Sequence, residues 1–230
     1  MMRVIQIPLR YSNAYLVIDQ QAILVDAGFP GDADAIERAI SRAGLAPRDV
    51  TLLVHTHGHI DHAGATSILQ HRHGIPVAIH HADAPNLVTG SNGVVKPRNM
   101  EARMVAAMLV KPFDPVTPDI VLTEEMSLRA YGIDGQVLFT PGHTKGSLSL
   151  LLGNGEAIVG DVMMGGWMGG VLRPQQPNYH YFVDDWNDVQ QSIARLLTHA
   201  PTRWYVGHGG PLPYARVAHH FSNSIKSHIP

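Results

Sequence analysis

Four metal-capable side chains within six residues constrain this chain more than any other feature. The run His57-Gly58-His59-Ile60-Asp61-His62 follows the apolar segment Thr51–Val54, which has the length and composition of a strand. Helical residues two positions apart face nearly opposite ways, so such a cluster suits a loop folded around an ion better than a helix. The pattern predicts a metal-binding loop after a strand; a solvated polar loop is the alternative.

Three further candidates share one placement relative to apolar runs. Each follows its run after a short turn that contains glycine, and loops at the carboxyl ends of strands converge in α/β proteins. We therefore expect these side chains to reach the same site as the cluster. The pairs of run and candidate are Val137–Phe139 with His143, Ala157–Val159 with Asp161, and Trp204–Val206 with His208.

Composition limits the chemistry of the predicted site. The chain has no cysteine, so the ligands must be imidazole and carboxylate groups, which favours Zn, with Fe or Mn as alternatives. The candidates exceed what one tetrahedral ion needs, whereas two divalent ions sharing a carboxylate would use them all. The predicted ligands are His57, His59, Asp61, His62, His143, Asp161 and His208.

The order of apolar runs and helical patterns predicts an α/β fold. A strand, an aspartate, a helix, a strand and a histidine occur in this order from Ile23 to His57 and again from Ala157 to His208. Two such halves packed face to face would form a sandwich of two mixed β-sheets with helices on the outer faces. The predicted helices are Asp32–Ala43, His62–His73, Arg98–Val110 and Asp184–His199.

The length of 230 residues, with 45% hydrophobic positions, predicts a single domain over residues 1–230. Prolines interrupt residues 84–118, which predicts an inserted lid or crossover outside the core. Glycines and prolines also fill Met163–Val183, which we expect to be a loop beside the site.

Charge and hydropathy narrow the classes of partner. The chain has 17 basic and 19 acidic residues, so no field of one sign favours nucleic acid or an anionic membrane. A small-molecule substrate is expected. No apolar run approaches the ~20 residues of a membrane helix and no leader pattern precedes Val17, so we expect a cytoplasmic protein. The sequence leaves open whether the chain forms a homo-oligomer.

The order of these motifs resembles the metallo-β-lactamase fold family, in its glyoxalase II and lactonase-like branch. The resemblance rests on HxHxDH, Thr140–Ser147, Gly160-Asp161 and Gly207–Pro211, and implies the αβ/βα sandwich of that family. It further implies that Asp161 bridges two ions and that Asp26 supports the ligand loop, although Asp26 could instead be a turn or capping residue. The implied ligand sets are His57, His59 and His143 for one ion, and Asp61, His62 and His208 for the other.

The resemblance implies a hydrolase that cleaves an ester, thioester or lactone bond through a metal-bridging hydroxide, with Asp61 orienting the nucleophile and relaying a proton. Two alternatives stay open: a mononuclear iron enzyme similar to persulfide dioxygenases, and a non-catalytic metal-binding protein. The absence of cysteine together with Asp161 departs from true β-lactamases. Met164 stands where the similar lactonases usually carry tyrosine, a role that Tyr179 or Tyr181 could take.

Methionine and tryptophan residues after Asp161 suggest an apolar wall for an acyl group, because methionine adapts to irregular apolar shapes. Ordinary core packing is the competing interpretation, most of all for the methionines of the predicted lid. Lys145 could attract a substrate carboxylate or be solvated. The wall candidates are Met163, Met164, Trp167 and Met168, with Met100, Met104 and Met108 in the lid.

Overall fold

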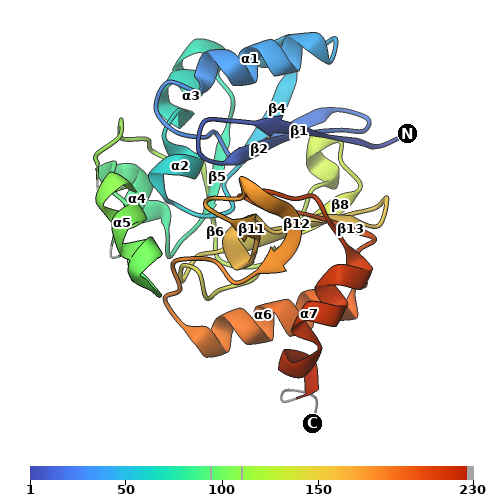
Figure 1. Cartoon of the computed structure of the whole chain (residues 1–230). Coiled ribbons are helices and arrows are strands. Elements are labelled where there is room, and N and C mark those ends of the chain that lie inside the picture. Colours follow the sequence, from blue (N-terminus) through green and yellow to red (C-terminus); the bar gives the residue numbers. More distant parts are fainter. Residues whose placement is uncertain (94, 110, 227–230) are drawn as a thin grey trace.

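The computed structural model describes residues 1–93, 95–109 and 111–226. Two six-stranded β-sheets face each other, and helices cover their outer surfaces, with α1 and α3 on one side and α6 and α7 on the other (Figure 1). Each sheet contains parallel and antiparallel pairs. This arrangement confirms the predicted αβ/βα sandwich of two mixed sheets.

The first sheet holds the N-terminal strands in chain order. Its first three strands are antiparallel and the pairs from the third to the sixth strand are parallel. The strands are β1 (Arg3–Pro8), β2 (Asn13–Ile18), β3 (Ala22–Val25), β4 (Val50–Val54), β5 (Val77–His80) and β6 (Ile120–Leu122). The helices that connect them are α1 (Ala33–Arg42), α2 (Ile60–Ala63), α3 (Thr66–His73), α4 (Ala84–Thr89) and α5 (Met100–Leu109), with a 3₁₀ turn at Pro47–Asp49.

The second sheet has the strand order β14-β13-β10-β9-β8-β7, and a separate hairpin pairs β11 with β12. Its strands are β7 (Met126–Ser127), β8 (Gly135–Phe139), β9 (Leu148–Leu152), β10 (Glu156–Ile158), β13 (Arg203–Tyr205) and β14 (Leu212–Pro213). The hairpin is β11 (Met164–Trp167) and β12 (Leu172–Asn178). The helices are α6 (Trp186–Thr198) and α7 (Tyr214–Lys226), with 3₁₀ turns at Arg129–Tyr131 and Gly160–Val162.

Three of the predicted helices are found and the fourth is divided. The pattern His62–His73 becomes α2 and α3, because the chain leaves the helix between Ala63 and Thr66. Helix α6 begins where the side chain of Asp185 accepts hydrogen bonds from the backbone N–H groups of Asn187 and Asp188, which satisfies two donors of the first turn. Helix α7 was not predicted.

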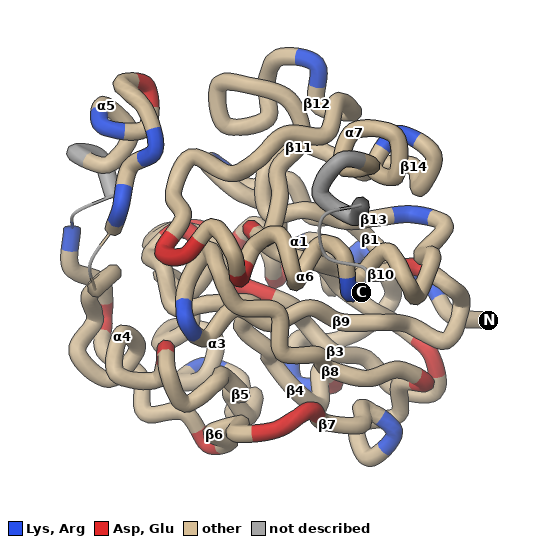
Figure 2. Tube along the Cα trace, turned by 90° about the horizontal axis from the view of Figure 1, so that it is seen from below, with Lys and Arg blue, Asp and Glu red and all other residues tan. Residues whose placement is uncertain are grey.

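The segment 84–118 crosses from β5 to β6, with α4 and α5 at one edge of the molecule (Figures 1 and 2). The prediction that this segment lies outside the core was wrong, because Leu87, Phe113 and Val116 are buried in the same apolar cluster as residues of the first sheet. These side chains anchor the crossover, while α5 lies further out. Residues 94 and 110, which the segment includes, lie outside the described residues.

The region Met163–Val183 was predicted to be a loop and instead contains the β11–β12 hairpin. Glycine and proline are poor strand residues, and here they form the paired strands of a short two-stranded sheet. The composition of this segment therefore did not indicate strands.

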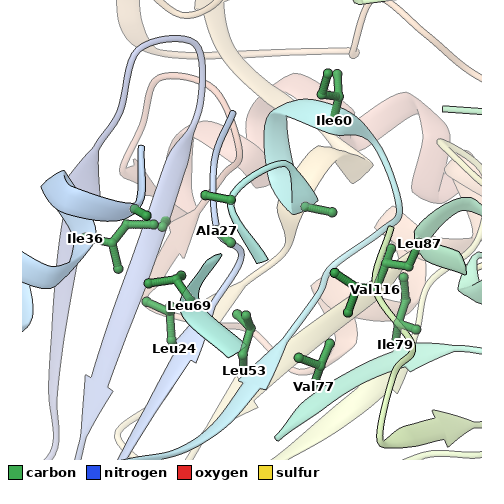
Figure 3. Packing of buried hydrophobic residues seen from close by; sticks show 14 of the residues in the cluster. Leu24, Ala27, Ile36, Leu53, Ile60, Leu69, Val77, Ile79, Leu87 and Val116 are labelled. Carbon is green, nitrogen blue, oxygen red and sulfur yellow. The ribbon is translucent and has the colours of Figure 1, made fainter. Parts of the chain in front are cut away.

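Alternation along the strands builds the core on both faces of the first sheet. In β3, Ile23 and Val25 point toward the second sheet, while Leu24 points toward the helices, because successive strand residues face opposite ways. Figure 3 shows Leu24 with Leu53, Leu69 and Ile36 in this helix-facing layer. A separate cluster packs α6 and α7 onto the second sheet. No helix within the described ranges has the length and apolarity to cross a membrane.

Candidate metal centre

All seven predicted ligands lie in segments that follow strands, with Asp61 and His62 in the short helix α2, and all are buried. Residues 57–62 follow β4, His143 follows β8, Asp161 lies in the 3₁₀ turn after β10, and His208 follows β13. The strands hold these loops at the edge where the two sheets meet, so the side chains converge although up to about 150 residues separate them. Three overlapping groups of these residues have potential ligand atoms within 4.8 Å of one another.

The first group consists of His57, His59 and His143. The Nε2 atom of His143 lies 3.2 Å from Nε2 of His57 and 3.1 Å from Nδ1 of His59. Its Nδ1 lies 2.8 Å from the carbonyl oxygen of Phe182, so Nδ1 carries the proton and Nε2 presents a lone pair. Tetrahedral zinc with Zn–N bonds of ~2.0–2.1 Å separates its ligand atoms by about 3.3 Å. The spacing of the three nitrogens therefore suits a divalent ion.

The second group consists of Asp61, His62 and His208. His62 donates from Nδ1 to Asp26 Oδ2 at 2.8 Å, and His208 donates from Nδ1 to the carbonyl oxygen of Tyr11 at 2.8 Å. Both rings therefore direct Nε2 toward the site. Neither Nε2 atom has a hydrogen-bond partner among the described residues, which is costly for buried polar atoms unless a ligand satisfies them.

Asp161 lies between the two groups. Its Oδ2 atom is 3.6 Å from His143 Nε2 on one side and 3.4 Å from His62 Nε2 on the other. His208 Nε2 is 3.3 Å away. The other oxygen, Oδ1, is buried without a hydrogen-bond partner in the part of the chain that the structure describes. One carboxylate therefore reaches both groups and keeps an acceptor free.

Carboxyl groups and histidines lie close together in the site, and burial and these neighbours shift their pKa values. Burial and neighbouring histidines outweigh the attraction of Asp161 and lower the pKa of His143 to about 4. Burial opposes charge at His208 as well, but Asp161 and Asp61 raise its pKa to about 10. Burial also disfavours ionised Asp61 and Asp161, yet the surrounding histidines lower the pKa of both carboxyl groups. The site is thus built to keep its carboxylates ionised beside positive charge, which fits divalent cations.

Asp26 supports the ligand loop through hydrogen bonds, as the resemblance implies. Its Oδ1 accepts from the backbone N–H of Thr56 at 2.8 Å, and its Oδ2 accepts from the Thr56 hydroxyl at 2.7 Å as well as from His62. Asp26 adopts a left-handed conformation with φ of 62°, which costs energy for a residue with a Cβ atom. Outer carboxylates of this kind fix the orientation of a ligating histidine.

Asp83 also positions the ligands, and it was not predicted from the sequence. Its Oδ2 accepts from the backbone N–H of Gly58 at 3.0 Å and from the Thr144 hydroxyl at 2.7 Å. Its Oδ1 accepts from the N–H of Gly146 at 3.0 Å. The buried carboxylate therefore ties the loop of His57 and His59 to the loop of His143.

His180 is a further site residue that sequence reasoning missed. It is buried, and its Nε2 lies 3.1 Å from Asp161 Oδ2. The backbone N–H of Phe182 donates to its Nδ1 at 3.3 Å. A neutral ring then carries its proton on Nε2, the nitrogen that lies near Asp161 Oδ2. His143, Asp161 and His180 also form a fourth group of closely spaced ligand atoms.

The turn between β1 and β2 supports the second group. The Ser12 hydroxyl donates to the carbonyl oxygen of Asp61. The side chain of Asn13, the first residue of β2, donates to the carbonyl oxygens of Val206 at 3.0 Å and Gly209 at 2.9 Å, on either side of His208. The turn and the start of β2 therefore join the ligand loops of the two halves.

A cavity of about 330 Å³ opens onto the metal ligands, four of which line it: His59, Asp61, Asp161 and His208. Of the predicted substrate-binding residues, Met168 and Tyr181 line this cavity. The Tyr181 hydroxyl is engaged, since it donates to Glu101 Oε1 at 2.5 Å. The wall of the cavity also includes His180, Arg10, Tyr11, Phe29, Val105, Lys111 and Phe182.

The other predicted wall residues lie elsewhere. Met163 and Met164 are fully buried in the core, and Trp167 is outside the cavity lining. Tyr179 packs against Trp186 and Phe221, with ring centroids 5.1 and 5.0 Å apart. The side chains of Met100 and Met104 are 70% and 74% exposed, and Lys145 is exposed outside the lining. The side chain of Met108 lies outside the described residues.

Known proteins of similar sequence and structure agree with this fold. The chain is 30% identical over 164 residues to the probable metallo-hydrolase YqgX of Bacillus subtilis, covering 70% of each chain. It is 29% identical over 205 residues to the probable metallo-hydrolase YflN of the same organism, covering 83% of this chain and 76% of that one.

Solved structures extend the likeness over nearly the whole chain. The B3 metallo-beta-lactamase BLEG-1 superposes with a TM-score of 0.71 at 25% identity, covering 96% of this chain and 99% of that one. The protein TTHA1623, solved in a di-iron-bound form, gives a TM-score of 0.63 at 26% identity, with coverage of 94% and 96%. The family model of the metallo-beta-lactamase superfamily matches residues 7–208. The resemblance seen in the sequence is thereby confirmed, and the chain belongs to the metallo-beta-lactamase superfamily of metal-dependent hydrolases.

Proposed function

We propose that this protein is a dinuclear metal-dependent hydrolase that cleaves a carboxylic ester, thioester or lactone bond of a small molecule. The observation that carries the proposal is the position of Asp161 Oδ2, within 3.6 Å of histidine nitrogens from both ligand groups. A carboxylate so placed serves two ions, and a mononuclear site would leave the second group of buried donors unsatisfied. The di-iron form of TTHA1623 supports the same stoichiometry.

His57, His59 and His143 would hold one ion, Asp61, His62 and His208 the other, and Asp161 both. Zinc is the metal that the nitrogen and oxygen donors favour, with iron and manganese as alternatives. Two such ions supply Lewis acidity and lower the pKa of water toward ~7, so that a nucleophile forms at neutral pH.

The chain's own residues provide orientation and proton transfer. Asp61 lines the cavity, and its Oδ2 lies 3.4 Å from His208 Nε2. Although burial opposes it, the charges of His62 and His208 lower the pKa of Asp61, so its carboxylate is ionised and can accept a proton from the nucleophile. His180 Nε2 lies 3.1 Å from Asp161 Oδ2, beside the carboxylate that both groups share.

The cavity suits a small acyl substrate. Its volume of about 330 Å³ lies at the lower end of the ~300–1,000 Å³ typical of small-molecule sites. Phe29, Val105 and Phe182 give it apolar walls, which exclude water around the scissile carbonyl and strengthen electrostatic effects there.

One experiment tests this proposal. The purified protein is analysed for metals and then assayed against a thioester, a lactone, an aryl ester and a cephalosporin. We expect close to two divalent ions per chain and hydrolysis of at least one of the first three substrates, abolished by chelation and restored by zinc. One iron per chain with oxygen consumption on a persulfide would instead establish a dioxygenase. Two ions without turnover of any substrate would favour a non-catalytic metal-binding protein.

A further inference from the structure

The wall of the cavity carries two basic side chains besides the metal ligands. Arg10 comes from the turn between β1 and β2, and Lys111 follows α5, about 100 residues later in the chain. Among the described residues that line the cavity, the only carboxylates are Asp61 and Asp161, which belong to the metal centre. The outer wall is therefore positively charged.

These basic groups lie nearer the mouth than the ligands do. Arg10 and Lys111 are exposed, whereas Asp61, Asp161 and His208 are buried at the base of the same cavity. The guanidinium carbon of Arg10 lies 5.1 Å from the ring centroid of Tyr11, a cation–π contact that orients it. Tyr11 in turn packs edge-on against Phe29, with centroids 5.2 Å apart.

Neighbouring charges leave these two groups available. Arg10 has one acidic neighbour, Asp32: burial raises the pKa of its carboxyl group, and the Arg10 charge opposes this shift only in part. Asp32 Oδ2 accepts from the N–H of Phe29 at 2.8 Å. No ion pair joins Arg10 or Lys111 to a carboxylate among the residues whose placement is described. Basic positions also outnumber acidic ones along α5 and its flanks (Figure 2), with four against one over residues 96–111.

Part of that charge is already engaged. Lys96 lies 3.6 Å from Asp184, and the guanidinium of Arg98 lies over the Trp186 ring. The one acidic residue of the stretch, Glu101, accepts the Tyr181 hydrogen bond. Lys111 thus brings an uncompensated positive charge to the cavity.

We propose that the natural substrate carries an anionic group, a carboxylate, at the end remote from the bond that is cleaved. The inference rests on the proposed function. The scissile carbonyl would lie at the metal centre, an apolar segment would contact Phe29, Val105 and Phe182, and the remote carboxylate would bind Arg10 and Lys111. Arginine suits this role because its planar fork matches the two oxygens of a carboxylate.

Two esters of equal length test the inference: the monophenyl ester of glutaric acid, which ends in a carboxylate, and that of glutaramic acid, which ends in a neutral amide. With zinc-loaded protein we expect kcat/KM to favour the carboxylate about tenfold. The Arg10→Gln/Lys111→Gln double variant, compared at equal metal content, should lose this preference, mainly through a higher KM for the carboxylate ester. Lys145→Gln removes an exposed lysine outside the cavity lining and should leave the preference for the carboxylate ester unchanged.

Calorimetric binding of glutarate and glutaramate provides a readout that does not depend on turnover. We expect glutarate to bind at least threefold more weakly to the double variant than to the unmodified protein or Lys145→Gln, and less tightly at higher salt. If neither ester is cleaved while this binding difference holds, the hydrolase proposal fails and the anion subsite stands. Equal glutarate binding by all three proteins, or equal cleavage of both esters, would overturn the subsite.

Discussion

The metal centre and the outer wall of the cavity are built in different ways. Every ligand lies three to eight residues beyond the end of a strand and is buried, and backbone or carboxylate groups orient three of the ligand rings. The outer wall comes from the β1–β2 turn, the end of α5 and the β11–β12 hairpin, and includes exposed side chains such as Met168. The contrast suggests that the base of the site sets the reaction and the wall sets the substrate, so substitutions in the two regions should differ in kind.

The largest effect should follow removal of the shared carboxylate. We expect Asp161→Ala to lower metal content and hydrolysis together, by more than the ~10–100-fold typical of outer-shell substitutions, because both ions lose a ligand. Metal analysis and kcat/KM on one sample measure this. Asp114→Ala, an exposed aspartate outside the cavity lining, is the matched control. Near-normal metal content and activity in Asp161→Ala would contradict a dinuclear centre.

An intermediate effect should follow substitution of the two supporting carboxylates. Asp26→Asn weakens the orientation of His62, and Asp83→Asn loosens the loops of His57, His59 and His143. We expect each to weaken binding of a different ion by ~10–100-fold. Competition with a chelator gives the two affinities. Denaturation of the metal-free proteins separates this effect from lost stability, and identical metal profiles for both variants would show that the two groups of ligands are not independent.

The smallest effect should come from the wall. Met168 lines the cavity and its neighbour Trp167 does not, so the pair makes a matched comparison. Against a series of acyl chain lengths we expect Met168→Ala to weaken the gain per added methylene, which is at most ~0.8 kcal/mol or roughly fourfold in the unmodified protein. Trp167→Ala should leave the series unchanged. A flat series in the unmodified protein would show that Met168 does not contact the acyl chain.

Both the sandwich and the convergence of the seven candidate ligands could be predicted from the sequence, because both depend on local patterns. A strand, a glycine turn and a polar side chain follow one another within a few residues. His180, Asp83 and Arg10 also follow strands, but no glycine turn precedes them, and Lys111 follows a helix, so no local pattern marked these four residues. Helix α7 was missed although Val217 and Phe221 are spaced as one helical face, because prolines precede it and few apolar residues mark it.

The turn between β1 and β2 has a consequence for how this protein can diverge. Its residues accept from His208 and donate to the backbone of Asp61, and the same few positions also supply Arg10 and Tyr11 to the cavity. A change of specificity made in this turn therefore puts metal retention at risk. Helix α5 contributes Val105 to the wall but no candidate ligand to the metal centre, so relatives of this chain should acquire new substrates mainly by varying α5, with the turn inherited almost unchanged.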